Sequence, residues 1–229
     1  MIPLGRSILV AGVVAVTWVA WSCMPSFGCK LEALEPGTSV PDSFVVAFET
    51  SRGRVDVMAR KAWAPNGVGR FFELVNTKFF DDARFFRVLK GFVAQFGMSG
   101  DTKVNEAWRH RCLADEPVKH SNTRGTISFA RGGPGTRSTQ MFFNLVDNPV
   151  LDTLEGLGFS PIAEVVSGIS VVDSLYSDYG ESSPRSGPQF GAEGPRQDSI
   201  AAQGNAYLVR GWPKLDYIKT ARVVQRWPK

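Results

Sequence analysis

Apolar and polar residues alternate in several short runs of this chain, which is the pattern of β-strands that bury one face. Two such runs, at residues 44–50 and 55–58, lie on either side of residues 51–53 and predict a β-hairpin. Further strands are predicted at residues 162–166 and 215–224. Many short strands separated by turn residues, with few helices, indicate an all-β fold built as a closed antiparallel barrel.

Three stretches follow the helical period instead, at residues 66–77, 169–176 and 200–208. The first carries one apolar stripe at positions i, i+3, i+4 and i+7, which predicts core packing. The stripe consists of Val68, Phe71, Phe72 and Val75. Residues 101–124 are polar and predict a long surface loop. Residues 180–195 are rich in Gly, Pro and Ser and predict a mobile loop away from any pocket.

Two polar side chains interrupt an otherwise apolar hairpin at Phe85–Asp101. The hairpin turns at residues 90–91, and Arg87 and Gln95 lie within its two strands. Burying a guanidinium costs free energy unless it is hydrogen-bonded. Arg87 therefore either extends along the surface to water or has a partner and a function, and this stretch alone leaves both readings open.

A second pair of apolar strands encloses a Gly/Pro-rich loop between Gly125 and Asn148. Its second strand opens with Gln140. Because side chains alternate along a strand, Gln140 and Phe142 share one face, while Met141 and Phe143 share the other. The stretch thus repeats the arrangement of the first hairpin, with an amide side chain next to an aromatic one.

Taken together, these stretches resemble the cyclophilin-type peptidyl-prolyl isomerases, over roughly residues 40–225. The resemblance is specific because many separate motifs occur in the family's order. They are Phe85 with Arg87, Gly91-Phe92, Gln95, Gly100-Asp101, Gly125-Thr126, Phe129-Ala130, Gln140 with Phe142, Leu151-Asp152, Gly158-Phe159 with Pro161, Val165-Val166 with Gly168, and Val171-Val172-Asp173. The resemblance implies a closed eight-stranded antiparallel β-barrel capped by helices at 66–77 and 169–177.

The resemblance also implies roles for individual residues. Arg87 falls at the family's catalytic arginine, and Gln95 at the glutamine that orients it and bonds the substrate backbone. The positions implied to bind substrate form an apolar wall for the proline ring and a groove for the preceding residues. They are Phe92, Val93, Phe129, Ala130, Arg131, Gln140, Phe142 and Leu151.

Several positions depart from the family's common pattern, among them Phe96 in place of the first Gly of a Gly-Gly pair. Phe86 stands where His often precedes the arginine, and Val93 stands where many members have Met. Arg131 replaces a common Asn and is expected to add charge to the peptide groove. Val150 stands where many members carry a Trp, which predicts weak inhibition by cyclosporin-type macrocycles. Phe159 is the nearest counterpart of the family's pocket His.

The chemistry that this resemblance implies needs no nucleophile, metal or cofactor. Rotation about an X–Pro bond is opposed by amide resonance, with a barrier of about 18–20 kcal/mol, and no bond has to break. A fixed guanidinium can stabilise the twisted amide. The expected function is peptidyl-prolyl cis-trans isomerisation in folding or unfolded proteins. The alternative is a proline-peptide binding module or holdase chaperone with little turnover.

Composition excludes some other classes of protein. The formal net charge is +4 and the basic residues are scattered, so the sequence gives no sign of a nucleic-acid surface. The only two histidines, His110 and His120, lie in a polar stretch and are expected to be solvent-exposed. No cluster of Cys and His has the spacing of metal ligands. We expect a monomer that binds proline-containing polypeptides without a cofactor.

The N-terminus has a separate character. Residues 8–24 are apolar, with Arg6 before them and Lys30 after them. The run is long for a signal-peptide core and slightly short for a membrane span, so residues 1–24 predict either a cleaved signal peptide or a single-pass N-terminal anchor. Either one places the chain in a secretory or exported compartment, an endomembrane lumen or a periplasm.

Domain boundaries follow from this. Residues 25–41, rich in Pro and Gly, predict a linker, and residues 42–229 the isomerase domain. The chain has three cysteines. In an oxidising compartment Cys23 and Cys29 could pair, which would leave Cys112 alone.

Overall fold

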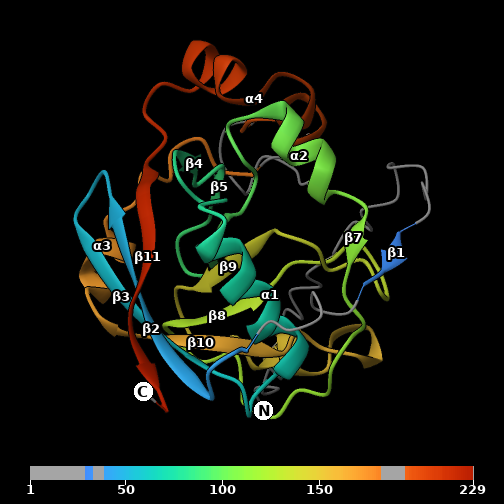
Figure 1. Cartoon of the computed structure of the whole chain (residues 1–229). Coiled ribbons are helices and arrows are strands. Elements are labelled where there is room, and N and C mark those ends of the chain that lie inside the picture. Colours follow the sequence, from blue (N-terminus) through green and yellow to red (C-terminus); the bar gives the residue numbers. More distant parts are fainter. Residues whose placement is uncertain (1–28, 33–38, 182–193, 229) are drawn as a thin grey trace, which may run out of the picture.

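The computed structural model describes residues 29–32, 39–181 and 194–228 (Figure 1). Its strands are β1 (Lys30–Leu31), β2 (Ser43–Thr50), β3 (Arg54–Arg60), β4 (Ala83–Arg84), β5 (Arg87–Val88), β6 (Val93–Phe96), β7 (Arg111–Cys112), β8 (Thr126–Phe129), β9 (Met141–Asn144), β10 (Pro161–Ser167) and β11 (Tyr217–Trp227). Its helices are α1 (Pro65–Asn76), α2 (Thr102–Trp108), α3 (Ile169–Asp173) and α4 (Gln197–Gly211), with two 3-10 turns, η1 (Pro149–Asp152) and η2 (Leu154–Gly156). The predicted hairpin around residues 51–53 and the helices near 66–77, 169–176 and 200–208 are therefore confirmed.

Nine strands form one antiparallel sheet in the order β4-β11-β2-β3-β10-β8-β9-β6-β5. The two end strands, β4 and β5, are consecutive in the chain and are joined only by Phe85 and Phe86. The sheet therefore curls back on itself through this short segment. If β4 and β5 are taken as one bent strand, nine strands become eight, and the predicted eight-stranded barrel is confirmed.

The barrel core is built largely from phenylalanine. Phe48 of β2 lies at the centre of it, with ring centroids of four other phenylalanines 6.0–6.3 Å away. They come from α1, the segment after it, β6 and β9, and are Phe71, Phe80, Phe96 and Phe143. Helix α3 adds Val172, which is 2% exposed. Aromatic rings thus fix α1 to the barrel, and an aliphatic side chain fixes α3.

Helix α1 begins with Pro65, whose fixed φ suits the first helical turn. Its N-terminus is capped from outside the helix, because the Glu116 carboxylate accepts hydrogen bonds from the backbone N–H groups of Asn66 and Gly67 (2.6 and 2.9 Å). Every residue of the predicted apolar stripe is buried, so its assignment to the core was correct. A carboxylate in the 101–124 segment therefore helps to hold the helix that closes the core.

The predicted loop at 101–124 is partly wrong, because α2 and β7 lie within it. Asp101 caps α2 by accepting a hydrogen bond from the Lys103 backbone N–H (2.8 Å). Trp108, near the end of the helix, is buried against Phe79, with ring centroids 5.8 Å apart. One polar cap and one buried aromatic are enough to form a short helix in a segment that has no clear apolar period.

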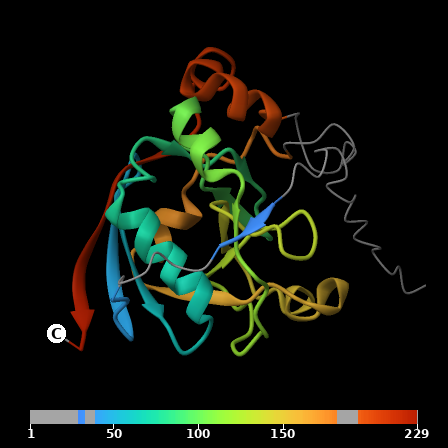
Figure 2. The same ribbon diagram turned by 45° about the vertical axis from the view of Figure 1, so that its right-hand side comes forward.

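A second, smaller hydrophobic cluster joins α4 to the barrel. In both views of the ribbon α4 lies over α2 (Figures 1 and 2). Within α4, Gly204 has φ 58°, and a Cβ there would lie 2.1 Å from the carbonyl oxygen of Gly100, so only glycine permits this close approach. The buried members of the cluster are Phe86, Met98, Ile200, Leu208 and Leu215.

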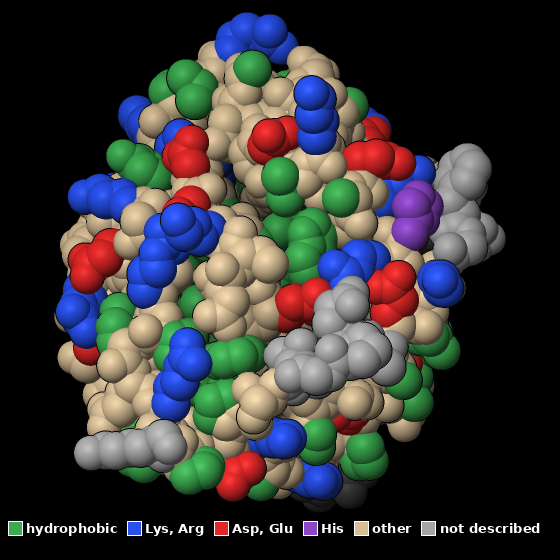
Figure 3. Space-filling model, viewed as in Figure 1, with side chains coloured by type: hydrophobic (Ala, Val, Ile, Leu, Met, Phe, Trp, Pro, Cys, Tyr) green, Lys and Arg blue, Asp and Glu red, His purple; other side chains and the backbone are tan. Residues whose placement is uncertain are grey.

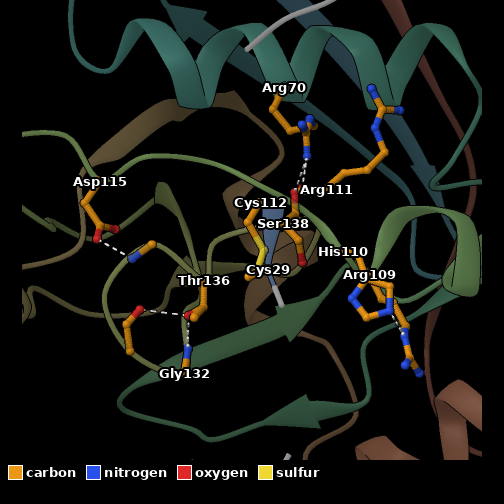
Figure 4. The surroundings of a disulfide bond; sticks show 12 residues. Cys29, Arg70, Arg109, His110, Arg111, Cys112, Asp115, Gly132, Thr136 and Ser138 are labelled. Carbon is orange, nitrogen blue, oxygen red and sulfur yellow. Dashed lines mark hydrogen bonds between the residues drawn. A yellow bond between two sulfur atoms is a disulfide. The ribbon is translucent and has the colours of Figure 1, made fainter. Parts of the chain in front are cut away.

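A disulfide joins Cys29 to Cys112, beside the parallel pairing of β1 with β7 (Figure 4). The suggested pairing of Cys23 with Cys29 is therefore wrong. A further tie beside the bridge is the ion pair between Arg111 and Glu32 (2.6 Å). In Figure 4, Arg70 of α1 points toward the same region and donates to the carbonyl oxygen of residue 111. The predicted linker thus contains a strand fastened to the domain.

Part of the expected organisation lies outside the described residues. The predicted signal peptide or anchor at residues 1–24 is one such part, and residues 182–193 of the predicted loop are another. Within the described ranges, no helix has the length and apolar character needed to cross a membrane.

On the face drawn in Figure 3, basic and acidic side chains are interspersed, as the scattered charges of the sequence suggest. The two histidines are half-buried, so the solvent exposure expected of them is only partial. His120 stacks on Trp63, with ring centroids 3.9 Å apart and planes 8° from parallel. A flat aromatic partner shields an imidazole in a way that a polar sequence context does not reveal.

Candidate active site

A single row of residues runs across four neighbouring strands on the outer face of the barrel. Arg87 of β5 is paired with Gln95 of β6, and Gln95 with Phe142 of β9. Phe142 in turn is paired with Ser128 of β8. Directly opposed residues of an antiparallel pair point to the same face. Strand register therefore places the arginine, the glutamine and the aromatic ring side by side.

Hydrogen bonds link the polar members of this face head to tail. Arg87 Nη1 donates to Gln95 Oε1 (3.1 Å), and Gln95 Nε2 donates to Gln140 Oε1 (2.9 Å). Gln140 Nε2 then donates to Gln197 Oε1 at the start of α4 (3.1 Å). Each amide accepts at its oxygen and donates from its nitrogen, so the bonds polarise one another in one direction. The guanidinium is thus held in place by a chain of amides.

Beside this chain lies a compact apolar cluster, separate from the barrel core. Phe142 and Phe159 meet edge to face, with ring centroids 5.8 Å apart. The buried members are Val93, Phe142, Leu151 and Phe159, and the half-buried residues packed against them are Phe92, Ala130 and Leu154. An aromatic and aliphatic surface of this kind, next to a fixed guanidinium, suits an apolar ring joined to a polar amide.

Two residues of the cluster, Leu151 and Phe159, are held by polar contacts behind them. The backbone N–H of Phe159 donates to the carbonyl of Leu151 (2.8 Å), and Asn122 Nδ2 donates to the carbonyl of Phe159 (2.8 Å). Asn122 Nδ2 also donates to Asp152 Oδ1 (2.8 Å), and the Ser121 hydroxyl donates to Asp152 Oδ2 (2.5 Å). Burial raises the pKa of Asp152, but the hydrogen bonds from Ser121 and Asn122 outweigh it, and the net pKa lies below the usual value.

Two expected substrate-binding side chains do not lie on this surface. Phe129 is 1% exposed and belongs to the barrel core. The Arg131 side chain is also 1% exposed, with its guanidinium 4.8 Å from the Phe159 ring centroid and 2.8 Å from Glu155. Arg131 therefore supports the apolar cluster from beneath, and the charge expected in the groove is buried and paired. Ala130 does lie against the cluster, as expected.

One contact was not foreseen at all. Glu181 forms a two-pronged ion pair with Arg87, in which Nε donates to Oε1 (2.6 Å) and Nη2 donates to Oε2 (2.7 Å). The expectation that residues 180–195 lie away from the pocket is therefore wrong for Glu181. No local motif marks this residue, because an acidic side chain in a Gly/Ser/Pro-rich stretch normally faces water.

The departure at Phe86 has a structural explanation. Phe86 is 1% exposed and packs in the cluster that holds α4. A polar histidine would fit this apolar setting poorly. Among the described residues, no three His, Cys, Asp or Glu side chains gather as a metal site. What the arrangement offers is a positioned cation, amide donors and acceptors, and an apolar surface.

Comparisons with known proteins find one matching family model and several relatives. Residues 45–194 match the family model described as cyclophilin type peptidyl-prolyl cis-trans isomerase/CLD. The chain is 32% identical over 142 residues to peptidyl-prolyl cis-trans isomerase B of Escherichia coli K12, covering 57% of this chain and 83% of that protein. It is 32% identical over 155 residues to peptidyl-prolyl cis-trans isomerase A of Dickeya dadantii, covering 64% and 78%.

Solved structures bear out the fold. A cyclophilin-type peptidyl-prolyl cis-trans isomerase of Cryptosporidium parvum superposes with a TM-score of 0.56 at 16% sequence identity, covering 79% of this chain and 97% of that one. Helix α4 begins at Gln197, after the last residue matched by the family model.

Proposed function

This chain belongs to the cyclophilin-type peptidyl-prolyl cis-trans isomerase family, and on that basis we propose how its residues perform the isomerisation. Arg87 is the catalytic residue, and Gln95 is the residue that orients it. The single observation that supports this assignment is the transverse row of Arg87, Gln95 and Phe142 beside a separate apolar cluster.

The proposed step is rotation of an X–Pro amide without any covalent chemistry. As the amide twists, resonance is lost and the proline nitrogen regains a lone pair. An N–H of Arg87 donates a hydrogen bond to that nitrogen or to the proline carbonyl, where it strengthens as the amide leaves planarity. Each factor of ten in rate requires about 1.4 kcal/mol of such differential stabilisation. A charge-assisted hydrogen bond in a mostly buried site is of the right order for two or three such factors.

Substrate contacts divide between two surfaces. The proline ring packs on the apolar cluster, for which Phe92, Val93, Phe142 and Leu151 are the proposed wall. The residues before the proline lie along Ala130, the backbone of residue 131 and Gln140. The substrates are proline-containing segments of folding or unfolded polypeptides, and the protein acts as a monomer.

We also propose that the protein works in an oxidising compartment outside the cytosol. Residues 1–24 direct it there as a cleaved signal or an N-terminal anchor. The Cys29–Cys112 disulfide supports this, because such bonds persist mainly in secretory and periplasmic spaces. On this proposal the isomerase domain includes Cys29, which the disulfide ties to Cys112, and does not begin at residue 42. Cell fractionation of the full chain tests the idea, and a uniformly cytosolic protein with free Cys29 and Cys112 thiols contradicts it.

The activity is tested on a protein that starts at residue 25 and so keeps Cys29. The cis-to-trans rate of a short Ala-Pro peptide is measured with and without protein. We expect the isomerisation rate to rise in proportion to protein concentration. The relaxation should become much faster than the uncatalysed one, which takes roughly 10–100 s. Binding of the peptide without acceleration would favour the alternative, a proline-peptide binding module or holdase.

A further inference from the structure

We propose that Glu181 is a positioning residue of this active site, which holds the Arg87 guanidinium in the orientation that catalysis needs. The inference rests on the proposed role of Arg87. It adds to the site a residue from the segment between α3 and α4.

The first step is the geometry of the ion pair. Both carboxylate oxygens of Glu181 accept from one edge of the guanidinium, Oε1 from Nε at 2.6 Å and Oε2 from Nη2 at 2.7 Å. Two parallel charge-assisted bonds fix the plane of the guanidinium as well as its distance. The side chains are only 14% and 13% exposed, so solvent screens this pair less than a surface pair.

The second step is a count of donors. A guanidinium carries five N–H groups. Glu181 takes one on Nε and one on Nη2, while Gln95 takes one on Nη1. Within the described part of the chain, one N–H on Nη1 and one on Nη2 therefore remain for a substrate. A contact that sequestered Arg87 would occupy these donors as well. The ion pair instead clamps the guanidinium along its Nε–Nη2 edge.

The third step is the rigidity of the carboxylate. The backbone carbonyl of Glu181 accepts a hydrogen bond from the Gly194 N–H (2.7 Å), which joins these two points of the segment between α3 and α4. Two residues before Glu181, Tyr179 packs on the cluster that contains Phe86, the neighbour of Arg87. Gln197, at the start of α4, also contacts the site, because its side-chain oxygen accepts a hydrogen bond from Gln140 (3.1 Å). Folded contacts thus fix the position from which Glu181 acts.

The consequence for the reaction is a loss of orientation when the clamp is removed. An unclamped arginine has several rotatable bonds and samples many positions. Only those that point an N–H at the twisting amide stabilise the transition state. Substrate binding depends mainly on the apolar cluster, so removing Glu181 should lower kcat and leave peptide affinity almost unchanged.

The experiment uses the full chain with Glu181→Ala and Glu181→Gln. The matched control is Glu164→Gln, which also removes a carboxylate paired with an arginine, Arg60, at 2.7 Å on the barrel. We expect Glu181→Ala to lower kcat roughly tenfold, with peptide affinity within about twofold of the unmodified protein. Glu181→Gln keeps one acceptor oxygen and should lose roughly threefold. Glu164→Gln should leave kcat unchanged.

Two further measurements keep the outcomes separate. The Nε–H resonance of Arg87 should be protected from exchange in the unmodified protein and should lose that protection in Glu181→Ala. Melting temperatures identify any variant that fails to fold, in which case the Gln variant carries the test. Unchanged or raised kcat in a folded Glu181→Ala overturns the positioning role. If Arg87→Ala keeps full turnover, the proposed function itself fails instead.

Discussion

The two faces of β6 and β9 are built from the same strands but do different work. On the inner face, Val88, Ala94 and Phe143 face one another across β5, β6 and β9, and all three are buried in the barrel core. On the outer face, one residue earlier in β5 and β9 and one later in β6, the row is Arg87, Phe142 and Gln95. A shift of one residue therefore separates packing from chemistry.

The comparison teaches that strand alternation can separate a face used for packing from a face that carries the candidate site. The inner face needs only apolar volume, and its aromatic rings meet at many angles. The outer face needs particular donors and acceptors at particular positions, each bonded to the next. Substitutions on the inner face should therefore cost stability, and substitutions on the outer face should cost activity.

The largest effect is expected at Arg87. Arg87→Ala should lower turnover by about two to three factors of ten, because the group that stabilises the twisted amide is gone. The protein should still fold, with a lower melting temperature because the mostly buried Glu181 carboxylate loses its partner. Arg87→Lys should restore little turnover because an ammonium lacks the planar fork. Turnover and melting are measured on the same sample. A folded Arg87→Ala protein with near-normal turnover would show that the outer row is structural.

The sharpest comparison uses two adjacent residues on opposite faces. Phe143→Ala empties part of the core and should lower the free energy of unfolding by about 3–5 kcal/mol, with normal turnover per folded molecule. Phe142→Ala should lose less stability, because its cluster is smaller, but should weaken both peptide binding and turnover. Urea unfolding and peptide titration distinguish them. Equal losses of activity in the two variants would contradict the division between faces.

A smaller, pH-dependent effect on stability is expected at Asp152, which accepts hydrogen bonds from Ser121 and Asn122 behind the apolar cluster. The pKa of Asp152 is lowered in the folded protein, so its stabilising effect is present above the unfolded value of about 4. That effect is lost as pH falls through the lower folded value. The difference in unfolding free energy between the unmodified protein and Asp152→Asn should therefore be constant from pH 7 to 5 and shrink below about pH 4.

Urea midpoints at several pH values test this prediction, with Asp42→Asn as the control for adding one amide at an exposed carboxyl. A difference between Asp152→Asn and the unmodified protein that persists unchanged to pH 2 would mean that the carboxylate charge does not matter there.

The smallest effect is expected at the far end of the amide chain. Among the described residues, Gln197 is linked to Arg87 through Gln140 and Gln95, so Gln197→Ala should lower turnover by no more than about threefold. Gln203→Ala, in the same helix but bonded to Arg210, is the matched control and should change nothing. If Gln197→Ala lowered turnover as much as Gln95→Ala, then α4 would belong to the same functional unit as Arg87 and Gln95.

Much of the fold and of the outer row could be predicted from the sequence, because strand alternation is local. The spacing of Gln140 and Phe142 and the hairpin of Arg87 and Gln95 both reflect that period. The core position of Phe129 was missed, although the same alternation places it with Ile127 on the core-facing side of β8.

Other features depend on contacts between distant segments. The disulfide partner of Cys29 lies 83 residues away, and Glu181 meets Arg87 across 94 residues. No local period marks such pairs. The burial of Arg131 depends likewise on Glu155 and Phe159, which reach it from the η turns and the segment after them. Helix α2 was within reach, because Asp101 as a cap and Trp108 as a buried anchor are both visible in the sequence.

The closure of the barrel has a consequence for dynamics. Its seam consists of β4 and β5, two residues each, so the backbone ladder there is short, and the buried rings of Phe85 and Phe86 pack beside it. Local openings of a protein favour regions with few ladder bonds. Amide exchange at the seam should therefore be faster than in β2 and β3. Since Arg87 lies on that seam, moderate warming should inactivate the enzyme, because the seam opens while most of the barrel is still folded.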